Sequence, residues 1–261
     1  MDKIVDGPNR KVARARSHLV ELQRIVDQYM AQNPFAIVEE QIPAHRQTIY
    51  YVETRTEIPA DISLIFGDLV HNLACSLDHL AFALIGASAK APQNVYFPFA
   101  KSEAALPDTI ARCQFHLTGK ATRAALNAAK PYPNGQTTLH AVHTLDGRDK
   151  HRLILMIAEG TNITGEQLGV IAQRDIRGGE FVIRTGDQPF LTANLTGTRK
   201  ALRALRHHKK YLDLGARFTI GLSNDCPLSH LDICGAGREM INSVEATITA
   251  LAEAWMEDER G

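Results

Sequence analysis

The sequence predicts an α+β fold in which a bundle of about three long helices packs with a small antiparallel β-sheet from the second half of the chain. Apolar residues recur at helical spacing in three stretches, near 8–31, 61–86 and 237–257. Between residues 152 and 223, short runs rich in β-branched and aromatic residues alternate with glycine turns, which is typical of antiparallel strands. We expect a single domain, 1–261, with a helical part at 1–150, a β-rich part at 152–223 and a last helix, 237–257, that returns to the bundle.

The composition is that of an ordinary soluble chain. Its 29 Lys and Arg balance its 29 Asp and Glu, so net charge alone indicates neither nucleic acid nor a membrane as partner. The four cysteines form no C-x-x-C pair, which favours a reduced compartment. The N-terminus, MDKIVDGPNRKVARARSHL, lacks the apolar core of a signal peptide. We expect a cytoplasmic protein without a membrane span, and self-association is left open.

The smaller elements follow from local signals. Asn33-Pro34 should end the first helix, because proline disfavours helical backbone in the residue before it. QTIYYVE, residues 47–53, predicts a strand, and residues 101–129 are expected to be helical in pieces before a turn at 130–135. The basic segment 198–212 is interpreted as a solvated helix. Strands are expected in the second half near 153–157, 167–174, 179–186, 189–196 and 216–223.

The central helix, expected from about Asp61 to Gly86, has an unusual polar face. The stretch from Pro59 to Gly86 contains no Lys, Arg or Glu, the residues that usually cover a solvated helix. Opposite its leucine-rich face lies a polar stripe, which we define as Asp68, His71, Asn72, Cys75 and His79, with Asp78 at its edge. Leu64, Phe82 and Ile85 also lie off the apolar face. We therefore expect neighbouring segments to enclose most of this helix, with a polar pocket over the stripe.

A second polar cluster follows in LHAVHTLDGRDKHRLIL, residues 139–155, and we expect it to face the stripe across a cleft. Imidazoles titrate near neutral pH and exchange protons with carboxylates, so His71, His79 and Asp78 are the predicted catalytic residues. His71, Cys75 and His79 are spaced to share a metal ion, but this spacing is frequent by chance and we assign no metal ligand and no cofactor. The predicted binding residues are Asp68, Asn72, Asp149, Lys150, His151, Arg152, Arg199, Lys200, Arg203 and Arg206.

Several of these motifs together resemble a family of uncharacterised bacterial proteins. The shared features are HNLACSLDH at residues 71–79, Phe97-Pro98, KPYP at 130–133 and DKHR at 149–152, so the resemblance covers roughly residues 47–160. The central helix is also similar to the HEPN superfamily, whose helical bundles often act as ribonucleases or RNA binders. That family's motif places an Arg four to six residues before a His. The positions before His79 hold Ala74, Leu73 and Asn72, so the resemblance implies RNA binding more than RNA cleavage.

Three functions of different classes fit these residues. The first is RNA or nucleotide binding through the polar cleft, with the basic residues 199–210 holding phosphates. The second is an enzyme, metal-assisted or not, in which His71, Cys75, His79, Asp68 and His151 bind a metal or transfer protons for a small-molecule substrate. The third is a structural or interaction protein whose buried polar network only joins its two halves. The sequence leaves open whether the protein is an enzyme.

Overall fold

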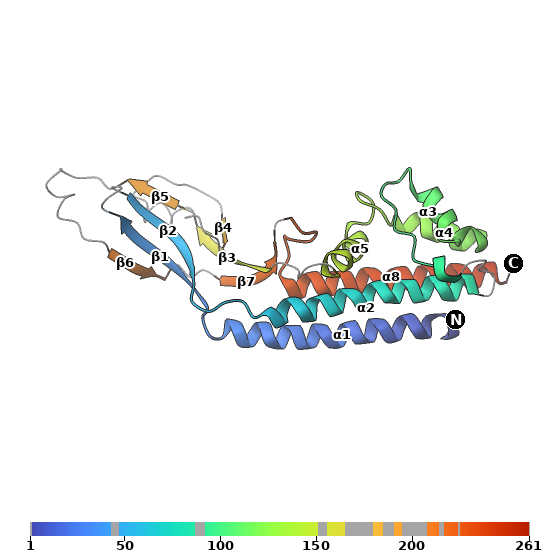
Figure 1. Ribbon diagram of the computed structural model, residues 1–261, viewed down its shortest axis with the longest axis horizontal. Coiled ribbons are helices and arrows are strands. Elements are labelled where there is room, and N and C mark those ends of the chain that lie inside the picture. The colour runs from blue at the N-terminus through green and yellow to red at the C-terminus, as the bar shows by residue number, and fades with distance from the viewer. Residues whose placement is uncertain are drawn as a thin grey trace. The chain divides into compact units, whose positions relative to one another are not determined.

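The computed structural model describes residues 2–42, 47–86, 92–150, 156–164, 180–184, 191–194, 208–213, 217–223 and 225–260 (Figure 1). The predicted α+β fold class is confirmed, and the chain forms two compact units. The helical unit comprises Met1–Arg24, Ala60–Leu155 and Leu222–Gly261, and the β-rich unit comprises Ile25–Pro59 and Met156–Gly221. The α-helices are α1 (Asp2–Met30), α2 (Ala60–Ile85), α3 (Leu106–Arg112), α4 (Lys120–Ala129), α5 (Thr137–Asp149) and α8 (Ile233–Asp258).

In the helical unit, α1 lies antiparallel to α2 and α8, as Figure 1 shows. Arg16 on α1 forms a bidentate ion pair with Glu245 on α8, at 2.7 and 2.8 Å. Gly237 marks the closest approach, because a Cβ there would come 3.1 Å from Leu19 of α1 and 3.3 Å from Leu69 of α2. A larger residue here would require the Leu19 and Leu69 side chains to shift by a few tenths of an ångström.

The apolar face of α2 forms the centre of this unit. Its side chains at Ile62, Phe66, Leu69, Leu73, Leu77 and Leu80 are inaccessible to solvent. By length and composition alone α2 resembles a membrane span, but 56% of the residues in its most apolar window are buried inside the protein. Because α1, α5 and α8 supply the matching apolar surfaces, α2 has the burial expected of a core helix.

The helices α3, α4 and α5 are connected by short turns and complete the helical unit. Asp258 near the end of α8 caps α4, since its carboxylate accepts the N–H groups of Ala121 and Thr122, both at 2.8 Å. Lys130 ends α4 in a left-handed conformation, with φ at 46°, and begins the predicted turn. Leu139, Val142 and Leu145 give α5 a fully buried face, which fixes the orientation of its polar residues.

The β-rich unit contains two sheets instead of the single small sheet expected. The first has the strand order β5-β2-β1-β6 and the second β4-β3-β7. In the first sheet β1 pairs antiparallel with both β2 and β6, so Val38 lies opposite Tyr51 on one side and Tyr211 on the other. The strands are β1 (Phe35–Ile42), β2 (Gln47–Thr54), β3 (Met156–Thr164), β4 (Glu180–Arg184), β5 (Leu191–Asn194), β6 (His208–Leu212) and β7 (Arg217–Leu222).

The observed elements correct the sequence predictions at several points. The strand β1 was not predicted, and it belongs with β2 to the β-rich unit although both precede residue 150. Residues 208–212 form β6, so the helix predicted through the end of the basic segment is wrong there. Helix α1 begins before Pro8 rather than at it, and α8 begins at Ile233, where Asp232 accepts the Gly235 N–H. The strand predicted at 167–174 lies outside the described residues.

Candidate functional site

The imidazole of His71 lies between a carboxylate and a thiol. Its Nδ1 is 2.9 Å from Oδ1 of Asp146 on α5, and its Nε2 is 3.4 Å from Sγ of Cys75, one turn further along α2. Because a carboxylate only accepts hydrogen bonds, we assign the imidazole proton to Nδ1. That tautomer leaves the Nε2 lone pair facing the thiol, so Cys75, His71 and Asp146 form a continuous hydrogen-bonded chain.

Within this hydrogen-bonded chain, Asp146 is buried and His71 is much more exposed. The side chain of Asp146 is only 9% exposed, whereas that of His71 is 52% exposed, so the imidazole is held from the protein side and open on the other. Lys150 Nζ donates to the second oxygen of Asp146 at 2.6 Å. This hydrogen bond is the main reason that the pKa of Lys150 is raised. With both oxygens engaged, the carboxylate of Asp146 is fixed in position.

The thiol of Cys75 is partly buried, and this burial raises its pKa. Lys11 of α1 and Lys150 oppose the shift, while Asp78 and Asp146 reinforce it. The raised pKa keeps the resting sulfur protonated at neutral pH. The S–H group can therefore donate to Nε2 of His71, in agreement with the tautomer assigned above.

Asp149 closes the other side of the contact between α2 and α5. Its carboxylate covers Gly67, where a Cβ would come 2.4 Å from Oδ1. Burial is the main cause of its raised pKa, and the nearby charges of Asp68 and Asp146 raise it further. The central helix thus meets the segment near residue 150 at this glycine as well as through the hydrogen bond between His71 and Asp146.

The other predicted residues of the stripe have different surroundings. Asp78 accepts the Phe97 N–H at 2.9 Å and so anchors the segment after α2, and burial raises its pKa. His79 is exposed, and its ring lies against Gly7 of α1. Asn72 donates to the carbonyl of Asp68 within α2. The structure therefore brings together His71, Asp149 and Lys150, and it gives Asp78 and His79 other neighbours.

Sequence reasoning did not select Asp146, and it considered Cys75 as a metal ligand or proton-transfer group but not as a nucleophile. One signal was present, since Asp146 lies four residues before Lys150 and both can pair on one helix face. Beside them, His143 stacks on Phe99 with ring centroids 4.7 Å apart, and burial lowers the pKa of both His143 and His140. The link from α2 to Asp146 could not be read from spacing, because it joins residues 75 positions apart.

The expected enclosure of the central helix is only partial. Leu64 and Phe82, at opposite ends of the stripe, are 50% and 53% exposed, whereas Ile85 is buried. With 13 residues, α5 is half as long as the 26-residue α2. It contacts α2 at Gly67 and His71, toward the N-terminal end of the stripe. At the candidate site His71 is therefore half exposed and Cys75 partly buried.

Other predicted site residues remain untested. His151, Arg152, Arg199, Lys200, Arg203 and Arg206 lie outside the described residues. Within the described part of the chain, no group of three or more His, Cys, Asp or Glu residues could hold a metal ion. The metal-assisted form of the enzyme hypothesis consequently gains no support from His71, Cys75 and His79.

No protein-family model, curated protein or solved structure matches this chain. The resemblance to a bacterial family and to the HEPN superfamily therefore stays a prediction. Any functional conclusion has to come from the geometry of the site itself.

Proposed function

We propose that the protein is a thiol-dependent enzyme that transfers or hydrolyses an acyl group of a small molecule. The observation that carries this proposal is the chain from Cys75 Sγ through the His71 ring to the buried Asp146 carboxylate. A nucleophile, a base within hydrogen-bonding reach and a third group that orients the base are the requirements for nucleophilic catalysis.

The reaction would proceed in two steps. Cys75 Sγ attacks the carbonyl carbon of the acyl donor while its proton passes to Nε2 of His71, and that proton then leaves with the departing group. Water next attacks the resulting thioester, again giving a proton to Nε2, and the carboxylic acid and free thiol are released. Lys11 and Lys150 act to lower the pKa of Cys75, so both favour the thiolate that forms as its proton passes to His71.

Two properties of the site support a small substrate that is reached from solvent. His71 is half exposed, and Cys75 is the one free cysteine of the four that is not buried. The purely structural alternative explains the bond between His71 and Asp146 equally well. It gives no reason for the thiol to lie on the free nitrogen of the imidazole.

The test is hydrolysis of 4-nitrophenyl acetate, a simple activated acyl donor. We expect turnover by the wild-type chain, loss to the uncatalysed background in Cys75→Ala, and a fall on the order of 100-fold in His71→Gln. His230→Gln removes another exposed histidine and should leave turnover unchanged. Folded Cys75→Ala and His71→Gln proteins that retain full turnover would exclude the proposal.

Stability of the same variants separates the structural alternative. If the network only joins α2 to α5, His71→Gln should lower the free energy of unfolding, and the wild-type chain should not hydrolyse the ester at all.

RNA or nucleotide binding stays a prediction, since its basic residues are mostly undescribed. It would be supported by salt-dependent binding of a single-stranded RNA that an Arg199, Lys200, Arg203 and Arg206 to Ala set abolishes.

A further inference from the structure

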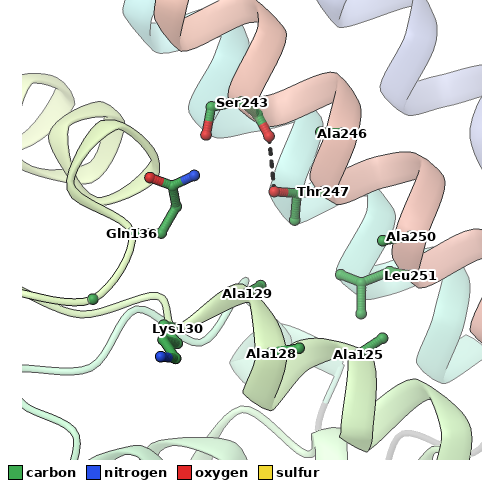
Figure 2. A pocket seen from close by; sticks show the side chains of 11 residues that line it. Ala125, Ala128, Ala129, Lys130, Gln136, Ser243, Ala246, Thr247, Ala250 and Leu251 are labelled. Atoms are coloured by element: carbon green, nitrogen blue, oxygen red, sulfur yellow. Dashed lines mark hydrogen bonds between the residues drawn. The ribbon is translucent and has the colours of Figure 1, made fainter.

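A cavity of about 560 Å³ lies between α4, α8 and the turn that precedes α5 (Figure 2). Ala125, Ala128 and Ala129 form the wall on α4, and Ala246 and Ala250 face them from α8. Methyl groups are too short to fill the space between the two helices, so it stays open, and Lys130, Gln136, Ser243 and Thr247 add polar groups to the alanine wall. Its volume falls within the usual range of small-molecule sites, roughly 300–1,000 Å³.

The helices that form this cavity are fixed at both of its ends. Asp258 holds the first turn of α4 through Ala121 and Thr122. At the other end, the N–H of Gln136 donates to the carbonyl of Lys130 at 2.9 Å and closes the turn. These contacts hold the first turn of α4 and the turn that follows its last residue.

One polar atom in the wall lacks a partner. The Oγ of Ser243 is buried, and it is the one buried side-chain N or O atom without a hydrogen bond in the described part of the chain. A helical serine usually bonds to the carbonyl one turn earlier, as Thr247 does with the carbonyl of Ser243 at 2.8 Å. In Figure 2 the Ser243 hydroxyl and the Gln136 amide point into the same space, one from each side. A ligand oxygen between them would satisfy both groups.

The charge at this site favours an anion. Lys130 is the one charged side chain among the described residues that line the cavity, and it is exposed. We propose that this cavity binds a small carboxylate with an apolar body. The body packs against the alanines, the carboxylate accepts hydrogen bonds from Ser243 and Gln136, and the exposed Lys130 contributes positive charge at the cavity's edge.

Octanoate is a suitable probe, and its binding to the full chain can be followed by calorimetry. We expect saturable binding that falls at least tenfold in Ala250→Leu, because the larger side chain fills the cavity. Ala124→Leu is the matched control, since Ala124 is an exposed alanine of α4 outside the cavity, and it should bind like the wild type. Ser243→Ala should bind about fivefold to tenfold more weakly, as expected for one lost hydrogen bond.

Two further measurements test the charge of the ligand's head group and the independence of this cavity from the thiol site. Octylamine has the same apolar chain with the opposite charge, and we expect no saturable binding of it. Cys75→Ala should bind octanoate normally, so failure of the proposed enzyme activity and failure of this site are distinguishable. Absent octanoate binding, equal binding of octylamine, or octanoate binding unaffected by both Ala250→Leu and Ala246→Leu would each overturn the inference.

Discussion

The carboxylate of Asp149, at the end of α5, lies directly against the backbone of Gly67 in the middle of α2. A Cβ on residue 67 would come 2.4 Å from Oδ1 and 2.5 Å from Cγ, so the contact depends on the absence of a side chain. Glycine in a helix interior is about 1 kcal/mol less favourable than alanine.

Gly67→Ala should displace the Asp149 carboxylate, and because that group ends a flexible side chain, the steric cost should roughly cancel the better helix propensity of alanine, to within about 1 kcal/mol. In an Asp149→Ala background the same substitution should be stabilising, which chemical denaturation of the four proteins would measure. Gly147→Ala is the control, because a Cβ there meets nothing within 4 Å. Equal effects of Gly67→Ala in both backgrounds would refute the contact.

The reactivity of Cys75 should depend on the charges around it. Because its pKa is raised, alkylation by iodoacetamide should accelerate only above the ordinary thiol value of about 8.5. Asp146→Asn removes a negative charge and should shift the midpoint of the pH–rate profile down. Lys11→Met removes a positive charge and should shift it up. Peptide mass spectrometry can follow the site of labelling, with the buried Cys113, Cys226 and Cys234 as internal controls. A midpoint that does not move in either variant would contradict this picture.

Asp258 should stabilise α4 as a cap supplied by another helix. Burial alone would raise its pKa, but the Thr122 and Ala121 N–H groups and the Thr122 hydroxyl outweigh burial and hold the pKa below its ordinary value. The stabilisation is therefore full above pH 4 or so, the ordinary aspartate value, and is lost as the pH falls through the lower folded pKa.

Asp258→Ala should cost about 1 kcal/mol at neutral pH and less in acid, as judged by denaturation at each pH. Glu259→Ala, which changes the neighbouring exposed carboxylate, should have little effect. If the loss of unfolding free energy in Asp258→Ala became larger in acid, the ionised carboxylate would not be the form that stabilises α4.

The pair of histidines near Phe99 should make the helical unit sensitive to mild acid. Burial lowers the pKa of His140 and His143, so the unfolded chain takes up these protons first, near pH 6.5. Above that value both imidazoles are neutral and the free energy of unfolding is at its full value. It decreases as the pH falls below that value, because the unfolded chain binds the protons more readily than the folded protein. Denaturation between pH 7.5 and 5.5 should show a smaller loss in a His140→Gln, His143→Gln variant than in the wild type. His230→Gln should behave as the wild type, and identical losses in all three proteins would be the contrary result.

The regular elements were predictable because each depends on a local pattern. The leucine repeat of α2, the proline after Asn33 and the β-branched residues of β2 each determine structure within a few positions, and all three expectations were met. The strand β6 was missed because its Lys and Tyr residues are stabilised by pairing with β1, which is distant in sequence. Local propensity carries little information about such pairing.

The candidate site was predictable only in part, for the same reason. A stripe of short polar residues without Lys, Arg or Glu drew attention to His71, which the structure places beside Asp146. Which acid would meet it depended on the rotation of α5, and that rotation is set by Leu139, Val142 and Leu145 in the core. The orientation of those three side chains selects Asp146 over Asp149 as the partner of His71.

The division of the chain into two units has a consequence for biosynthesis. The polypeptide passes from one unit to the other four times, at residues 24–25, 59–60, 155–156 and 221–222. Neither half can be obtained by cutting the gene at one place. Helix α8 carries Glu245 and Asp258, which hold residues far earlier in the sequence, on α1 and α4. The helical half therefore cannot be completed before α8 has been synthesised.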